Sequence, residues 1–258
     1  MKTEFIYFLI CLLIPRLFTQ WKDDTVLTLK SVSFTIIVEI VLLIPLFYSP
    51  HSFFILFLFL FIYHGFQFFL NRIFVKNKKD DRIKTIYLKR IIEFVFMVFA
   101  GSFVFGIFLK DTSLNSYISE MIAFITENNI LFINYDPLFS KRMIVYIFGL
   151  LLVTNEVNNV IRWVLNFLKT DTDKATISKE QFNRGQIIGV IERILFYFFV
   201  ITENFASIAF ILAAKGFTRF KELDNKNFAE YVLIGTLLSC AAAIFCSFFI
   251  KEIIASCF

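Results

Sequence analysis

The chain has 258 residues, of which 58% are hydrophobic, 18% are charged and 38 are Phe. Its mean hydropathy is +0.74, whereas a soluble domain is nearer half apolar and a quarter charged. This composition excludes a secreted disulfide scaffold, a disordered chain and a conventional soluble enzyme. It predicts an all-α fold, a polytopic transmembrane helical bundle with about six spans and a short N-terminal apolar helix.

The cysteines and histidines do not indicate a metal site or a disulfide. The two histidines, His51 and His64, are too few for a site that needs several imidazole ligands. The four cysteines have apolar neighbours and form no CxxC pair, which is typical of small core residues: Cys11, Cys240, Cys246 and Cys257. The sequence has no P-loop, GxSxG or HExxH motif, so we predict no catalytic residue, no cofactor and no metal.

The N-terminal membrane region is predicted to comprise residues 1–142. Residues 5–15 are apolar but too short to cross about 30 Å of hydrocarbon, and Pro15 with Arg16 is expected to end this helix. We interpret it as a retained or re-entrant segment, with a signal peptide as the alternative. Further on, we predict a helical hairpin with its turn at residues 49–51, a third span and an amphipathic surface helix, at 32–49, 52–71, 91–109 and around 118–130.

The C-terminal membrane region is predicted to comprise residues 143–258 and to contain helices lined with polar groups. Its expected spans are residues 143–168, 187–214 and 231–250. A polar linker, 170–182, and a charged connection, 215–230, separate them.

Lys and Arg residues predict the orientation of the chain. If the most cationic block, residues 71–90, is cytoplasmic, then alternating spans place 17 Lys and Arg inside and 7 outside. We therefore expect a protein of the bacterial inner membrane with its C-terminus in the cytoplasm. Four of the outside cations lie within residues 215–226, and a buried helix turn there would shift the final spans. Membrane lipids, not nucleic acid, are the expected partners of the basic block.

Charged residues inside the predicted span 187–214 mark the first candidate site, because charge at membrane depth is costly. Glu192 and Arg193 are followed eleven residues later by Glu203 and Asn204. Eleven residues make almost three helical turns, so the four residues are expected to form two parallel polar lines about 16 Å long.

A matching polar face is predicted on the span 143–168. Asn155, Asn158, Asn159 and Arg162 follow the spacing of one helical face, with Glu156 beside it. We expect this face to meet Glu192 and Arg193, with Glu156 or Glu192 neutralising an arginine. The result is either a hydrated path, gate or ligand cavity, or an interhelical network that fixes the helix register.

Glycines and two further cations complete the candidate residues. Gly185, Gly189 and Gly235 are assigned to helix packing, because the spacing of Gly185 and Gly189 permits a close approach of another backbone. Lys215 and Arg219 share one face at the end of the span. They are expected to hold a lipid phosphate or nearby carboxylates, or to extend to the membrane interface.

The C-terminal half also carries a pattern of short motifs. These are Gly185-Gln186-Ile187-Ile188-Gly189 with Glu192-Arg193, Ala213-Ala214-Lys215 with Arg219-Phe220, Ala229-Glu230-Tyr231, and Ile234-Gly235-Thr236-Leu237-Leu238-Ser239. The segment of about 55 residues that contains them resembles a bacterial integral membrane family catalogued as domain-of-unknown-function family 3307.

In that family, a His-xxx-Asp pair followed by Leu-Gln opens the chain and a second such pair comes later, which implies a metal site. Here residues 15–21 keep the outline, but Arg16 stands where the first acid would be, and Phe68 stands four residues after His64. The resemblance implies a polytopic inner-membrane protein that has lost this metal chemistry, and it implies no known activity.

We therefore expect a non-enzymatic membrane protein that acts as an oligomeric scaffold, sensor or pore, including the membrane-disrupting effector of a defence system. Its expected partners are lipids and either further copies of itself or another protein. One alternative is a transporter of ions or small solutes that uses Glu192, Arg193 and Glu203. A second alternative is a degenerate metal-dependent membrane hydrolase.

Overall fold

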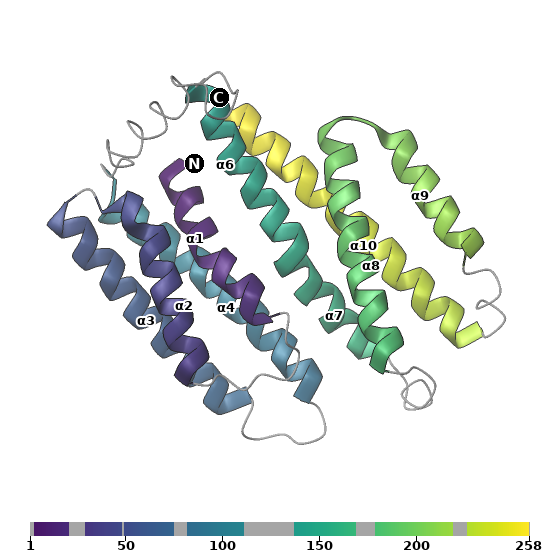
Figure 1. The fold of residues 1–258 in the computed structure, drawn as a ribbon, viewed down its shortest axis with the longest axis horizontal. Helices are drawn as coiled ribbons and strands as arrows, with labels where there is room; N and C mark the ends of the chain where they lie inside the picture. Colours follow the sequence, from purple (N-terminus) through teal and green to yellow (C-terminus); the bar gives the residue numbers. More distant parts are fainter. Residues whose placement is uncertain are drawn as a thin grey trace. The chain divides into compact units, whose positions relative to one another are not determined.

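The computed structural model describes residues 3–20, 29–47, 49–74, 82–110, 137–168, 179–218 and 226–257. All regular secondary structure in these ranges is helical (Figure 1). The helices form two compact units, one made of Met1–Leu151 with Ile253–Phe258 and the other of Leu152–Glu252. The amphipathic helix predicted around residues 118–130 lies outside the described residues.

Four helical stretches in the described ranges are long and apolar enough to cross a membrane: Pro50–Phe74, Thr85–Ile107, Lys141–Phe167 and Leu233–Ser256. Val32–Leu46 and Phe205–Phe217 are apolar but shorter. The all-helical fold with apolar helices is thus confirmed, and the total of six spans stays a prediction.

The first unit is built around helix α1, Thr3–Gln20, which packs against α2 (Leu29–Leu43), α4 (Arg82–Ile107) and α6 (Pro137–Leu151). Side chains on several faces of α1 are fully buried, among them Ile6, Phe8 and Leu13. The expected helix end at Pro15 is wrong, because Pro15 lies inside α1. Proline disfavours a helix interior, but here the following residue, Arg16, is held by contacts with neighbouring helices that keep the helix continuous.

The predicted hairpin turn is explained by its capping residues. Helix α2 ends in the 3-10 turn η1, Ile44–Leu46, and α3, Pro50–Phe74, follows. Ser52 N–H donates to Ser49 Oγ at 3.1 Å, and Ser49 N–H donates to Ser52 Oγ at 2.9 Å. This reciprocal pair is a capping box, and Pro50 takes the first helical position, where its missing N–H costs nothing.

The predicted span 143–168 is one continuous helical stretch with a widened turn inside it. Helix α6 passes directly into the π-turn η2, Leu152–Glu156, and then into α7, Val157–Leu168. A π-turn closes i→i+5 rather than i→i+4 hydrogen bonds, and such turns are frequent at functional sites.

The predicted single span 187–214 is wrong, because the chain forms two antiparallel helices there (Figure 1). Helix α8, Lys179–Ile201, ends before Glu203, and α9, Phe205–Thr218, runs back beside it. Asn204 N–H donates to the Phe199 carbonyl at 2.7 Å and Glu203 N–H to the Val200 carbonyl at 3.2 Å. With Glu203 at φ +60°, these bonds form a Schellman motif, which terminates a helix. Helix α10, Lys226–Cys257, completes the described chain.

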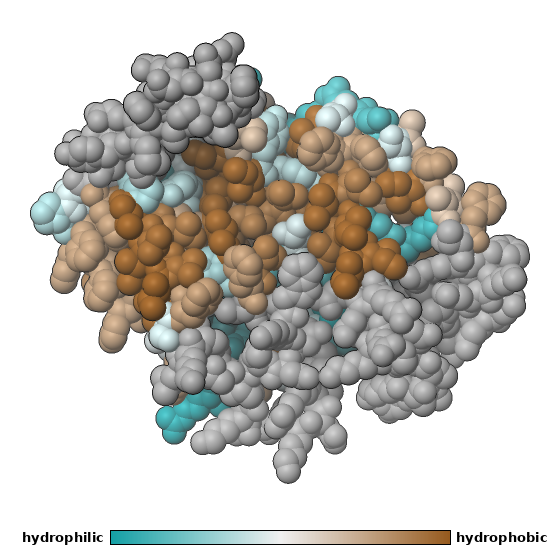
Figure 2. All heavy atoms as spheres, in the orientation of Figure 1, coloured by the Kyte–Doolittle hydropathy of each residue, from teal (hydrophilic) through white to brown (hydrophobic). Residues whose placement is uncertain are grey.

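The distribution of side chains differs from that in a soluble protein on the surface and in the buried charges. Large aromatic side chains point outward, for example Phe61 and Phe245, each 74% exposed. Apolar residues accordingly cover much of the described surface visible in Figure 2. Charged side chains, in contrast, are buried in both units, as with Glu39 and Arg193. Exposed apolar faces of this extent indicate contact with lipid or with other protein.

Candidate functional site

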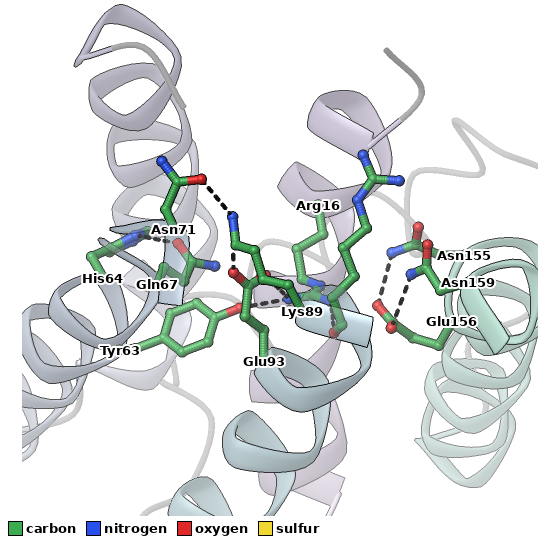
Figure 3. A network of polar contacts seen from close by, with 11 residues as sticks. Arg16, Tyr63, His64, Gln67, Asn71, Lys89, Glu93, Asn155, Glu156 and Asn159 are labelled. Carbon is green, nitrogen blue, oxygen red and sulfur yellow. Dashed lines mark hydrogen bonds and ion pairs between the residues drawn. The ribbon is translucent and has the colours of Figure 1, made fainter. Parts of the chain in front are cut away.

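The first unit contains a buried ionic group that joins three helices, here called the Arg16 cluster. Its members are Arg16 from α1, Tyr63 and Asn71 from α3, and Lys89 and Glu93 from α4. Figure 3 shows their polar atoms turned toward one another. Arg16 Nη1 donates to Tyr63 Oη at 3.0 Å and to Glu93 Oε2 at 3.3 Å.

The cluster depends on the early start of α4. The span was predicted to begin at residue 91, but α4 begins at Arg82, so part of the cationic block is helical. Arg16 Nη2 donates to the Arg90 backbone carbonyl at 3.0 Å, and Lys89 Nζ donates to Asn71 Oδ1 at 3.2 Å. Glu93 thus has one cation on each of its oxygens, with Lys89 Nζ 3.5 Å from Oε1.

Next to the Arg16 cluster lies a second buried pair, Glu39 of α2 and His64 of α3. His64 Nε2 is 2.6 Å from Glu39 Oε2, and His64 Nδ1 is 3.1 Å from Gln67 Oε1. The Glu39 side chain is only 2% exposed. The pair fixes the register of the α2–α3 hairpin at its buried side.

The second unit has its own buried group, the Arg193 cluster, which is formed by Arg193, Asn158, Ser239 and the Val153 carbonyl. Arg193 Nε donates to the Val153 carbonyl at 3.2 Å, Nη1 to Ser239 Oγ at 3.3 Å and Nη2 to Asn158 Oδ1 at 2.9 Å. The expected meeting of Arg193 with the asparagine face is therefore confirmed by Asn158. All three acceptors are neutral oxygens, supplied by the η2–α7 stretch and by α10.

Glu192 does not point to the same partners as Arg193. Its Oε2 accepts a hydrogen bond from Lys215 Nζ at 2.6 Å, which links α8 to α9. Lys215 therefore binds a carboxylate, which was one of its expected alternatives, and that carboxylate is Glu192. Arg219 lies outside the described residues.

The remaining residues of the predicted polar face are buried beside Glu156. Asn155 Nδ2 donates to Glu156 Oε1 at 3.0 Å and Asn159 Nδ2 to Glu156 Oε2 at 3.3 Å, as Figure 3 shows. Arg162 is also buried. The π-turn carries Asn155 and Glu156, so the widened backbone and this carboxylate group occupy the same stretch of helix.

The predicted polar lines along one helix are absent, because Glu203 and Asn204 lie in the turn after α8. Both are exposed rather than stacked over Glu192 and Arg193. Glu203 Oε1 accepts a hydrogen bond from Lys251 Nζ at 2.5 Å. That bond holds the pKa of the Glu203 carboxyl below its usual value.

The glycines do not mark a close helix contact. Apart from the neighbouring residues and the local helix backbone, no described atom lies within 4 Å of a Cβ built at Gly185. At Gly189 the one such atom is Nη1 of Arg193, on the same helix, at 3.6 Å. The expected approach of another backbone at these two positions is therefore wrong within the described part of the chain. Gly235 faces the Leu165 side chain of α7, and a Cβ built at Gly235 would lie 3.5 Å from it, an ordinary contact distance.

The sequence-based selection missed the Arg16 cluster. Glu39 and Glu93 lie inside the predicted spans 32–49 and 91–109, but the sequence alone gives no partner for either. The usable signal was that a carboxylate at membrane depth requires a cation or a hydrogen-bond donor, and Arg16, His64 and Lys89 were the nearest candidates in predicted spans or at their ends.

Within the ranges that the structure describes, no group of three or more His, Cys, Asp or Glu side chains is arranged to hold a metal ion. Both clusters join helices, and the Arg16 cluster also pairs its cations with the Glu93 carboxylate. No protein-family model, no curated protein and no solved structure matches the chain. The resemblance to domain-of-unknown-function family 3307 therefore stays a prediction.

Proposed function

We propose that the chain is a non-enzymatic polytopic protein of the bacterial inner membrane, acting as a scaffold, sensor or pore. The observation that supports it is the combination of outward-facing aromatic side chains with buried charged ones. Phe side chains such as Phe61 and Phe245 face outward, while Arg16, Glu93 and Arg193 are enclosed by helices. A lipid bilayer favours this arrangement, because charge exposed to hydrocarbon costs several kcal/mol, on the order of 3 per residue on insertion scales.

The two ionic clusters favour a structural or sensing role over catalysis. Each cluster joins at least two helices that are distant in sequence, and its contacts are those of cations with carboxylates, amides, hydroxyls and carbonyls. Catalysis by a nucleophile requires a nucleophile within reach of a base that activates it. The ionic contacts instead hold the helices in position. A change in the charge of one of the contacting side chains would weaken its contact and allow the helices to move.

The transporter alternative loses the feature on which it rested. Its path followed Glu192, Arg193 and Glu203 along one helix, and α8 ends before Glu203. Glu192 and Arg193 are held by Lys215 and by neutral oxygens on one unit, whereas Glu203 lies exposed at the turn.

The turn between α8 and α9 also leads us to propose a different topology for the C-terminal part. Lys251, near the end of α10, contacts Glu203 in this turn, and Gly235, near the start of α10, packs against Leu165 at the end of α7. The α8–α9 turn and the end of α10 therefore lie at one end of the unit, and the start of α10 lies at the other.

If α8 and α9 each cross or enter the membrane from the cytoplasmic side and return to it, residues 215–226 become cytoplasmic. Twenty of the 26 Lys and Arg residues then belong to cytoplasmic segments and four to outer ones, with Lys2 and the buried Arg193 uncounted. This charge bias is stronger than that of the single-span arrangement. It places the end of α10 outside the cytoplasm.

Membrane integration and reconstitution test the proposed function. The full chain is expected to stay in the membrane pellet after alkaline carbonate extraction, and recovery in the soluble fraction would contradict membrane integration. Purified protein in liposomes then separates the versions of the proposal. Release of a trapped dye or ions supports a pore, including a membrane-disrupting effector of a defence system. Intact vesicles together with a defined oligomer by light scattering support a scaffold or sensor.

A further inference from the structure

In the Glu39–His64 pair, both nitrogens of the His64 ring contact oxygen atoms, although one such contact would be enough to join the two helices. His64 Nε2 is 2.6 Å from Glu39 Oε2, while the other ring nitrogen, Nδ1, is 3.1 Å from Gln67 Oε1. Both imidazole nitrogens thus face oxygen atoms. A neutral imidazole has one donor and one acceptor nitrogen, and only the imidazolium donates from both. The local contacts therefore favour a second proton on the ring.

Charged and titratable groups of both signs surround the pair. Arg16 faces the pair from α1, together with the neutral Tyr7 and Cys11. Tyr63 adjoins His64 on α3, and α4 contributes Lys89 and Glu93, with the Arg90 guanidinium farther out over the Tyr87 ring.

The described charges of this region balance when the imidazole is neutral. The two cations, Arg16 and Lys89, match the two carboxylates, Glu39 and Glu93. A proton on His64 adds a positive charge to a buried site, and burying charge is costly. The hydrogen-bond partners thus favour the proton while burial opposes it, so the pair is a place where a proton can bind and leave.

We propose that Glu39 and His64 form a proton-binding site between helices α2 and α3. The site takes one proton from a hydronium ion, whose O–H bond breaks and which leaves as water. An N–H bond forms at the ring nitrogen that carried no proton, within the Nε2–Glu39 Oε2 or the Nδ1–Gln67 Oε1 contact. With the proton bound, His64 bridges the Glu39 carboxylate of α2 and the Gln67 amide of α3. The site rests on the geometry alone, and a pH-sensing role for it rests on the proposed membrane function.

The presence of only two histidines allows a direct test. His51 is exposed at the start of α3, so a His51→Asn variant leaves His64 as the only imidazole. The full chain, labelled with ¹⁵N-histidine and purified in detergent, is titrated from pH 8 to 5 by nuclear magnetic resonance, which distinguishes imidazolium from both neutral tautomers. A His64→Asn chain, in which His51 is retained, gives the reference titration of an exposed histidine.

The expected result is a His64 signal that changes from neutral to imidazolium within this range and differs from His51. Adding Glu39→Gln to His51→Asn is expected to lower the imidazolium fraction at a fixed pH by about tenfold or more, the effect of losing an adjacent carboxylate. Gln67→Leu is expected to lower it less, and it serves if the Glu39 variant does not fold. A His64 ring that stays in one state from pH 8 to 5, or that titrates identically in all variants, would overturn the proposal.

The outcome is independent of the carbonate and liposome experiments. A titrating His64 in a chain that fails to integrate into membranes would contradict the proposed function and leave the proton site in place. A chain that integrates into membranes but whose His64 does not titrate would contradict the proton site and leave the proposed function in place.

Discussion

Arg193 Nε donates a hydrogen bond to the backbone carbonyl of Val153 at 3.2 Å, and Val153 lies inside the π-turn η2. In an α-helix, a carbonyl is occupied by the N–H four residues later. A π-turn departs from this pattern, which leaves room for a donor from another helix. The widened turn thus gives a continuous helix a backbone acceptor for a buried guanidinium.

Replacing Arg193 is expected to destabilise the protein strongly. Arg193→Met removes three donors and leaves the Val153 carbonyl, Asn158 and Ser239 to find other partners, at a cost of about 2–4 kcal/mol. Arg193→Lys should recover only part of this, because one ammonium group does not reproduce the planar fork. Thermal unfolding in detergent measures the difference, with the exposed Arg72→Met as the matched control. Equal melting temperatures for the Arg193 and Arg72 variants would contradict the assigned role.

The contact between Glu192 and Lys215 provides a test of the α8–α9 hairpin. In one continuous helix these residues, 23 positions apart, would be separated by about 35 Å and would not interact. In the hairpin they are 2.6 Å apart and largely buried. A double-mutant cycle with Glu192→Gln and Lys215→Met should therefore give a coupling energy of about 1–3 kcal/mol. Additive effects on unfolding would favour the continuous helix.

Some of the fold was predictable because its signals are local. The α2–α3 turn follows from Ser49 and Pro50, whose capping preferences act within four residues. The break after α8 was not predictable in this way. Its left-handed residue is Glu203, where glycine would be the usual signal, and the apolar residues on both sides read as one span.

The two clusters also differ in how far their contacts could be predicted from local sequence patterns. The contact of Arg193 with Asn158 was predicted because the spacing of the asparagines places them on one face of a helix, and a buried arginine on a neighbouring helix needs such polar partners. The contact of Arg16 with Glu93 joins residues 77 positions apart, across helices whose packing the sequence does not give. Pro15 also led to the wrong helix end, which removed Arg16 from consideration as a buried residue.

In the Arg16 cluster, the carboxylate should matter more than either of its cations. Glu93→Gln leaves Arg16 and Lys89 close together without the negative charge that compensates them. We expect this to lower the free energy of unfolding by about 3–5 kcal/mol. Lys89→Met keeps the pair of Arg16 and Glu93 and should cost less. Adding Lys89→Met to Glu93→Gln should recover part of the lost stability, as measured by unfolding in detergent. A double variant less stable than Glu93→Gln would contradict this charge account.

The left-handed backbone conformation at Glu203 can be tested separately from the ion pair of Glu203 with Lys251. Glu203→Gly and Glu203→Val both remove this ion pair, so their difference isolates the φ of +60°. Glycine adopts this conformation freely, whereas a β-branched residue is strained there. We expect the Val variant to unfold at a clearly lower temperature than the Gly variant. Indistinguishable melting curves would show that the left-handed residue contributes nothing to the turn.

The topology proposed for the C-terminal part is tested by the side from which single cysteines react. In a chain whose four native cysteines are replaced, Thr202→Cys and Glu252→Cys should react with a membrane-impermeant maleimide on intact spheroplasts. Arg72→Cys, beside the cationic block, should react only after the membrane is opened.

The physical reason is that the α8–α9 turn lies at the same end as the last turns of α10, through the contact of Glu203 with Lys251. If residues 187–214 crossed the membrane once, Glu252 would lie on the same side as Arg72. The cysteines of Glu252→Cys and Arg72→Cys would then both be protected from the maleimide on intact spheroplasts. Labelling of Thr202→Cys without Glu252→Cys would show that α10 does not cross with α9. The pattern expected here, with Arg72 alone protected, follows from a returning α9 that brings the cations of residues 215–226 to the cytoplasmic side.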